Sequence, residues 1–289
     1  MSPSPEPRIA GLLARCEFPP PGRAVTCAVS GGADSLALLV LACGAGCAVT
    51  AVHVDHGLRA GSGAEAQVVE AAAARFGAAF RSVRAEVAHG PNLEARARAA
   101  RYALLEPDVL TGHTADDRAE TVLVNMLRGT GLDGIGVLGT SRHPIVGLRR
   151  SETRALCADL GLEPVTDPTN DDPAFVRNRV RHEILPLLDD VAGRDVAVLL
   201  ARLAQLAVDD VAFLDALADA IDPHDAVGLA AAPVVLARRA VRGWLTVDGY
   251  PPDLAAVERV LAVARGEMVA CEITGGRRVS RSANRLSVR

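Results

Sequence analysis

The sequence predicts an α/β protein in which a largely parallel sheet carries helices on both faces and is followed by a smaller, mostly helical domain. Short apolar runs alternate with helix patterns over about the first 190 residues, which is typical of parallel strands joined by helical crossovers. Consecutive helix patterns then follow, up to a short alternating segment at the end. Apolar residues make up 49% of the chain and aromatic residues only 3%, which favours alternating strands and helices over a β-sandwich.

Four apolar runs are expected to be strands, with helix signals between them. A capping box formed by Ser62 and Glu65 opens a helix that ends near Gly77. Asn92 caps the next predicted helix, whose apolar positions continue to Leu104. Ligands bind beyond the carboxyl ends of parallel strands, so functional residues are expected directly after the strands. The predicted strands are Val25–Val29, Val49–Val54, Phe80–Val83 and Val109–Thr111.

The change of pattern predicts a domain boundary between residues 192 and 193. Helices are expected over Val196–Ile221, Val234–Val247 and Asp253–Arg265 of the second domain, residues 193–289. The last residues alternate around Gly275-Gly276 like a small hairpin. From Gly275 to Arg289 there are five arginines and no acid, so this hairpin is basic although the whole chain carries a formal charge of −4.

Composition argues against several classes of protein. The six cysteines include no C-x-x-C pair and show no metal-site spacing or disulfide framework. The N-terminus lacks the apolar core of a signal peptide, and the apolar stretch from Leu36 to Val52 is split by Gly44 and Gly46. A soluble, cytoplasmic protein with no membrane partner is therefore expected.

The first predicted strand ends on S-G-G-A-D-S, residues 30–35, which can form an anion-binding loop. A turn at Gly31-Gly32 that leads into a helix presents backbone N–H groups and the positive end of the helix dipole. The hydroxyl groups of Ser30 and Ser35 can donate further hydrogen bonds. Asp34 suits a phosphate site only if a cation such as Mg²⁺ is present. The alternative is an ordinary glycine-rich turn, and the Walker A pattern is absent because the chain contains no lysine.

The complete hexapeptide resembles the pyrophosphate-binding loop of the N-type ATP pyrophosphatases, the PP-loop superfamily. The resemblance implies a Rossmann-like sheet of the adenine nucleotide alpha hydrolase type. It also implies cleavage of ATP between its α and β phosphates and adenylation of a substrate, with residues 30–35, including Ala33, at the nucleotide. The loop alone does not choose among the synthetases and tRNA thiolases that share it.

Two further stretches resemble one branch of that superfamily, the tRNA(Ile)-lysidine synthetases. The second predicted strand runs into H-V-D-H-G-L-R, with His53, Asp55 and His56 at its carboxyl end. The segment E-A-R-A-R-A-A-R-Y places Arg96 and Arg101 on a predicted helix. The resemblance implies that these five residues contact ATP or substrate, whereas a hydrogen-bonded strand end and a solvated helix face are the alternatives.

The stretch T-G-H-T-A-D-D-R-A-E-T, residues 111–121, is the most informative. On a helix that begins after Thr114, the residues Asp116, Asp117 and Glu120 fall within an arc of roughly 100°. Three carboxylates this close repel one another unless a cation joins them. A capping box between Thr114 and Asp117 is the alternative explanation for part of the pattern. The whole stretch resembles the lysidine synthetases, in which the acids serve metal and amino acid and Gly112 and His113 lie at the nucleotide.

Residues 164–188 complete the resemblance with D-P-T-N and R-N-R-V-R. The matching residues are Asp167, Asn170, Arg177, Asn178 and Arg181. Arginines at this spacing offer planar donors for phosphate or carboxylate, and a salt-bridged helix start is the alternative.

The resemblance implies that ATP adenylates the wobble cytidine of the CAU anticodon of tRNA(Ile) and that free lysine then displaces AMP. Asp34, Asp117, Glu120 and Arg177 are the expected catalytic residues, with Mg²⁺ on Asp34 and Asp116. The helical domain is expected to bind tRNA, and oligomeric state is left open, a homodimer included. The rival hypotheses are a tRNA 2-thiocytidine-type thiolase and a nucleotide- or RNA-binding module without chemistry. The arginines expected to contact tRNA are Arg277, Arg278, Arg281 and Arg285, together with Arg238, Arg239 and Arg242.

Overall fold

The computed structural model describes residues 7–55, 62–85, 104–165, 172–247 and 250–289. The chain divides into two compact units, Met1–Val208 and Asp209–Arg289. This division falls inside helix α10 (Val196–Ala218), later in the chain than the boundary predicted between residues 192 and 193. The predicted domain boundary stays a prediction. Among the described residues, no helix combines the length and apolar character needed to cross a membrane.

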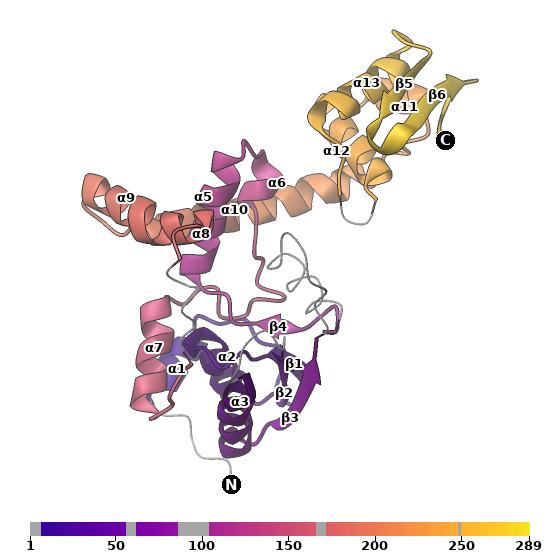
Figure 1. Cartoon of the computed structure of the whole chain (residues 1–289). Helices are drawn as coiled ribbons and strands as arrows, with labels where there is room; N and C mark the ends of the chain where they lie inside the picture. Colours follow the sequence, from indigo (N-terminus) through magenta and orange to yellow (C-terminus); the bar gives the residue numbers. More distant parts are fainter. Residues whose placement is uncertain (1–6, 56–61, 86–103, 166–171, 248–249) are drawn as a thin grey trace. The chain divides into compact units, whose positions relative to one another are not determined.

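The first unit contains the predicted parallel sheet (Figure 1). Its described strands are β1 (Ala24–Ala28), β2 (Ala48–Asp55), β3 (Ala79–Arg84) and β4 (Leu110–Thr111). They are hydrogen-bonded in the order β3-β2-β1-β4, and every pair is parallel. The predicted α/β class is therefore confirmed. Because β1 lies between β2 and β4, the loop that follows β1 is at the centre of the sheet's carboxyl edge.

Both faces of this sheet are apolar because alternate residues of each strand point to opposite sides. Cys27 and Ala51 belong to the core that includes α2 (Ala33–Gly44) and α3 (Ser62–Phe76). Val52 and Val109 belong to a separate apolar cluster. The helix predicted from Asn92 lies outside the described residues. Helices α1 (Pro7–Leu13) and α7 (Arg150–Asp159) pack against α2 on the side away from the sheet (Figure 1).

Several short helices follow β4 and carry the second half of the site. These are α5 (Ala115–Leu127), α6 (Leu132–Ile135), α8 (Val176–Arg179), the π-helix η2 (Val180–Ile184) and α9 (Leu185–Ala192). Ala119 of α5 and Val180 of η2 share a small buried cluster with Leu185 and Ala197. This packing brings the polar residues of α5 and α8 to the same place.

The second unit contains α11 (Ala226–Ala231), α12 (Val234–Leu245) and α13 (Leu254–Arg265), which confirms two predicted helices. The predicted terminal hairpin is part of a larger sheet. The structure has three antiparallel strands there: β5 (Ala270–Ile273), β6 (Arg277–Ser282) and β7 (Arg285–Val288). The 3₁₀ turn η3 (Thr274–Gly276) makes the expected bend. Ala283 and Asn284 make a second turn with φ angles of 44° and 63°. Alanine is uncommon in such a turn, so the sequence carries little signal for it.

Candidate active site

A cavity of about 810 Å³ opens at the carboxyl end of β1. The loop after β1, the end of β4 and the first turns of α5 and α7 contribute to its lining. This is where ligands bind in open parallel sheets. Ten of the residues singled out from the sequence line it: Ser30, Gly32, Ala33, Asp34, Ser35, His53, Gly112, His113, Asp117 and Arg181.

The loop of residues 30–35 has the conformation of an anion cradle. Gly31 has a φ of 91°, which disfavours any residue with a side chain, and Gly32 is the N-cap of α2. The Ser35 hydroxyl donates to the Gly32 carbonyl at 2.9 Å and accepts from the Ser30 N–H at 3.1 Å. Ser35 therefore holds the loop closed, and its contact with a ligand in the cavity stays a prediction.

Gly112 has a steric reason to be glycine. A Cβ atom placed there would lie 2.7 Å from the Asp34 carbonyl oxygen and 2.9 Å from the Ser35 nitrogen. Both neighbours are backbone atoms, which cannot move aside cheaply. Gly112 thus lets the end of β4 approach the first turn of α2, which places His113 in the lining of the cavity near residues 30–35.

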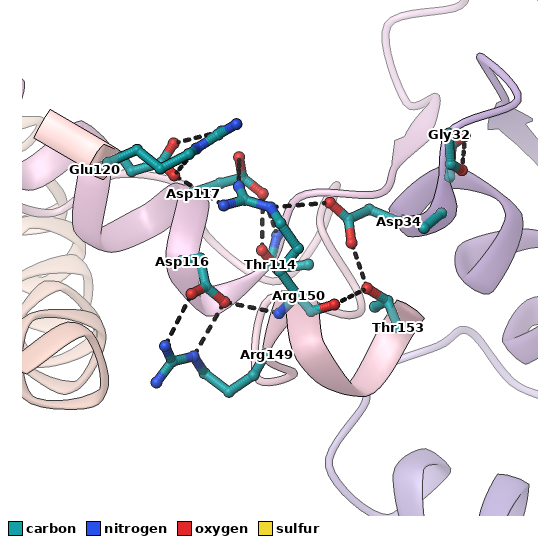
Figure 2. Close-up of polar contacts among 12 residues, drawn as sticks. Gly32, Asp34, Thr114, Asp116, Asp117, Glu120, Arg149, Arg150 and Thr153 are labelled. Atoms are coloured by element: carbon teal, nitrogen blue, oxygen red, sulfur yellow. Dashed lines mark hydrogen bonds and ion pairs between the residues drawn. The ribbon is translucent and has the colours of Figure 1, made fainter. Parts of the chain in front are cut away.

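Asp34 lies between the loop and α7 (Figure 2). Its Oδ1 accepts a short hydrogen bond from the Thr153 hydroxyl, and its Oδ2 lies 3.4 Å from Nε of Arg150. Burial raises the pKa of Asp34, the Thr153 hydrogen bond opposes this, and the nearby charge of Asp117 adds to it. The side chain is still 25% exposed, so this carboxylate can meet a ligand in the cavity.

Arg150 joins Asp34 to the acids of α5, as Figure 2 shows. Its Nη1 lies 3.0 Å from Oε1 of Glu120, and its Nη2 lies 3.0 Å from Oδ1 of Asp117. The spacing of these acids predicted a cation among them, and a guanidinium from α7 occupies that position. Arg150 was not among the predicted site residues.

Glu120 is the most buried of these acids, with a side-chain exposure of 0%. Arg181 binds both of its carboxylate oxygens, at 2.7 and 3.1 Å, and Arg177 binds Oε2 at 2.8 Å. Burial acts to raise the pKa of Glu120, but Arg181, Arg150 and Arg177 together outweigh it and lower the pKa. Glu120 and Arg177 do not line the cavity directly, so the structure places them behind Asp117 and Arg150.

Asp117 combines the two explanations that the sequence left open. Its Oδ2 accepts from the N–H of Thr114 at 2.9 Å, as in a capping box, while its Oδ1 accepts from Arg150 and Arg177. Burial would raise the pKa of Asp117, but Arg150, Arg177 and His113 outweigh it and lower it to about 2. The cap fixes the carboxylate, and the arginines keep it ionised.

Asp116 faces a different partner from the one predicted. Its carboxylate accepts from Nε and Nη2 of Arg149, at 3.0 and 2.9 Å, and from the N–H of Arg150 at 2.7 Å. It does not line the cavity, and the described residues contain no cluster of three or more His, Cys, Asp or Glu arranged to hold a metal. Metal binding by Asp116 therefore stays a prediction that would require Arg149 to move.

Two histidines share the hydroxyl of Thr111 at the cavity wall. Thr111 Oγ1 lies 2.7 Å from Nδ1 of His113 and 2.6 Å from Nδ1 of His143. The two rings meet edge to face, with their centroids 4.6 Å apart. Burial lowers the pKa of His143 to about 3, and the neighbouring His113 and Arg142 add to this effect. His143 is therefore neutral at physiological pH.

This neutral histidine predicts a loss of stability in mild acid. Between pH 6.5 and about 3 the unfolded chain binds a proton at His143 that the folded chain refuses, so the free energy of unfolding falls as pH decreases. A full proton difference corresponds to a slope of about 1.4 kcal/mol per pH unit. We expect His143→Asn to reduce this slope between pH 6.5 and 5 in urea unfolding. An equal slope in wild type and His143→Asn would contradict the assignment.

The remaining residues predicted for the site are either buried, outside the cavity lining, or outside the described residues. His53 is buried, its Nδ1 lies 3.0 Å from the Val29 carbonyl, and its Nε2 has no hydrogen-bond partner among the described residues. Asp55 ends β2 without lining the cavity. His56, Arg96 and Arg101 lie outside the described residues, as do Asp167 and Asn170.

Helix α7 is the part of the site that sequence reasoning missed. It supplies Arg150, Thr153, Arg154 and Cys157 to the cavity or to Asp34. A usable signal was present, because Arg149 and Glu152 form a capping-box contact at the helix start and Gly161 follows its end with a φ of 61°.

Comparison with known proteins agrees with this geometry. The sequence model of the PP-loop domain matches residues 5–188. The tRNA(Ile)-lysidine synthase of Nocardia farcinica is 44% identical over 280 residues, which cover 90% of this chain and 88% of the relative. The chain belongs to the tRNA(Ile)-lysidine synthase family. The Rhodococcus erythropolis member is 42% identical, with 86% of this chain and 82% of the relative covered.

A solved structure with much lower sequence identity shares the fold of this member of the lysidine synthase family. The U34-tRNA thiolase NcsA from Methanococcus maripaludis, described with its [4Fe-4S] cluster, has a TM-score of 0.56 and 16% identity. The match covers 70% of this chain and 78% of that chain. At this identity the likeness concerns the fold alone. The PP-loop domain is an ATP-using domain, so its match supports the use of ATP by this chain.

Proposed function

We propose that this chain ligates lysine to C2 of the wobble cytidine in the CAU anticodon of tRNA(Ile), with ATP converted to AMP and diphosphate. The proposal depends on one observation: the PP-loop carboxylate Asp34 and the acid pair Asp117 and Glu120 meet in one place, bridged by Arg150. A phosphate cradle serves the nucleotide, and an acid pair serves an amine. The names of the family relatives support the same reaction.

The reaction needs two substitutions at adjacent centres. First, the C2 oxygen of cytidine attacks the α-phosphorus of ATP, and the bond from that phosphorus to the bridging oxygen breaks, so diphosphate leaves. Second, the lysine amine, having lost a proton, attacks C2, and the C2–O bond breaks to release AMP. The loop N–H groups at Gly31 to Asp34 are suited to the first step, because they bind charge that develops on phosphate oxygens.

Mg²⁺ fits the first step through Asp34. This carboxylate is a hard oxygen ligand, it reaches the cavity, and burial raises its pKa, so a divalent cation there would compensate a poorly solvated charge. Bound Mg²⁺ would supply charge neutralisation for the phosphates. Thr153 would hold the other carboxylate oxygen and so orient Asp34.

The acid pair is proposed to receive the ammonium group of lysine. In the structure the charges of Asp34, Asp117 and Glu120 are balanced by Arg150, Arg177 and Arg181. An incoming ammonium must therefore take over a position that a guanidinium holds. Arg150 is the candidate to move, because it lines the cavity and contacts all three acids.

The thiolase alternative lacks reactive thiols in the described site. The sequence contains no C-x-x-C pair. Cys157 is the cysteine that lines the described cavity, and burial raises its pKa to about 11, with Asp34 adding to the effect. A thiol that stays protonated at neutral pH is a poor nucleophile and a poor cluster ligand.

A direct assay tests the proposal. Protein incubated with a CAU-anticodon tRNA(Ile) transcript, ATP and radiolabelled lysine should transfer one label per tRNA and release AMP and diphosphate. A transcript with uridine at the wobble position is the matched control and should remain unlabelled. ATP binding or hydrolysis without lysine transfer would favour the binding-module or thiolase alternative.

The arginines predicted to contact tRNA differ in their contacts within the second unit. Arg277 donates to the Leu245 carbonyl, Arg281 to the Ala264 carbonyl, and Arg285 pairs with Asp222. These arginines have partners within their own unit, whereas Arg278 is exposed and its side chain has no such partner among the described residues. We propose Arg278 as the first tail residue to test for tRNA contact. A cytoplasmic location and lysine as co-substrate belong to the same proposal.

A further inference from the structure

The side of α7 that faces the PP-loop carries one residue with no assigned role. Thr153 donates to Asp34, and the thiol of Cys157 lies 3.5 Å from the Ala33 carbonyl. Arg154 is four residues after Arg150 and three before Cys157, so it projects from the same side of the helix as these two cavity residues. It lines the cavity together with these loop residues.

Arg154 differs from the other arginines of the cavity in its charge balance. Arg150 is bound by three acids, and Arg181 is bound by both oxygens of Glu120. Within the described structure, Arg154 makes no hydrogen bond or ion pair, and it is exposed. A guanidinium that is not neutralised by a carboxylate is available to an anionic ligand in the cavity.

We propose that Arg154 binds the β- and γ-phosphates of ATP, the part that leaves as diphosphate. The inference rests on the proposed function. The loop supplies neutral N–H donors, and Asp34 adds negative charge beside them, so a polyphosphate there needs a positive side chain from outside the loop. The chain has no lysine, and a guanidinium matches phosphate oxygens with two parallel donors.

The proposed contact should help the reaction as well as binding. Charge accumulates on the diphosphate as its bond to the α-phosphorus breaks. A cation on the departing group therefore stabilises the transition state more than the bound ATP. Because Arg154 sits on α7 with Arg150, one helix would hold the leaving group and the acid cluster at a fixed separation.

Calorimetry with three probes tests the assignment: α,β-methylene ATP with Mg²⁺, diphosphate with Mg²⁺, and AMP. We expect Arg154→Ala to weaken binding of the first two by roughly 10-fold or more, as for a lost charged hydrogen bond, and to leave AMP unchanged. Arg154→Lys should recover part of the loss, since it keeps the charge without the planar donors. Arg23→Ala is the matched control, because Arg23 is exposed at the opposite end of β1.

Three outcomes would overturn the proposal. Equal weakening of AMP would place Arg154 at the nucleoside end, and unchanged affinity for all three probes would remove it from the phosphate site. Weakened tRNA binding with normal diphosphate binding would make it an RNA contact. The wild-type controls separate this test from that of the function: nucleotide binding without lysine transfer would end the proposed function and leave the role of Arg154 intact.

Discussion

Asp34→Asn should lower the rate of tRNA adenylation by roughly 10²- to 10³-fold, the size of effect seen when one charge-stabilising group is removed from an active site. The variant keeps an oxygen that can accept from Thr153, so the loop geometry should survive. It removes the carboxylate that we propose as the Mg²⁺ ligand. Rapid-quench measurement of AMP–tRNA formation checks the rate, and filter binding of tRNA should show unchanged affinity.

Stability should move in the opposite direction from activity in this variant. Burial raises the pKa of Asp34, which means that the folded protein holds this charge at a cost. A neutral asparagine removes that cost, while Arg150 retains Asp117 and Glu120 as partners. We therefore expect the melting temperature of Asp34→Asn to equal or exceed that of the wild type. A catalytic group that destabilises its own fold is common in enzymes.

Asp116→Asn is the control that distinguishes the two predicted metal ligands. Its carboxylate binds Arg149 outside the cavity, so we expect adenylation to change much less than in Asp34→Asn. Equal losses in both variants, each restored by raised Mg²⁺, would support the sequence-based prediction that both acids hold the metal. Normal adenylation in Asp34→Asn would place the cation elsewhere.

Glu120→Gln should reduce the free energy of unfolding by about 3–5 kcal/mol, the usual effect of removing one partner from a buried ion pair. Glu120 is fully buried and binds Arg150, Arg177 and Arg181. A neutral amide leaves these guanidinium groups without their shared counter-charge. Urea unfolding gives the free energy directly, and the melting temperature should fall by roughly 10 °C.

Two further variants show whether this loss comes from charge. Glu183→Gln removes an exposed acid that pairs with Arg179 one helical turn away, and no measurable destabilisation is expected. The double variant Glu120→Gln with Arg181→Gln should be more stable than the sum of its single variants, because it removes an unpaired cation together with the acid. Additive losses would contradict the electrostatic explanation and point to packing.

The local elements of this protein could be predicted because their signals are short in range. A strand of four to eight residues and the loop after it are encoded by neighbouring residues, so the four strands and the Gly31-Gly32 turn were found without tertiary information. The second turn of the terminal sheet was missed, because Ala283 has no local preference for a positive φ.

The sequence by itself determined the PP-loop, its acid Asp34 and the spacing of Asp116, Asp117 and Glu120 along one helix, because all of these depend on residues close together in the chain. It also predicted that the acids need a cation. Only the tertiary structure decided which one. Arg150 lies 30 or more positions from each acid it binds, and no periodicity of the chain reports that α7 packs beside the loop. A guanidinium can reach three carboxylates only after the fold has brought α2, α5 and α7 together.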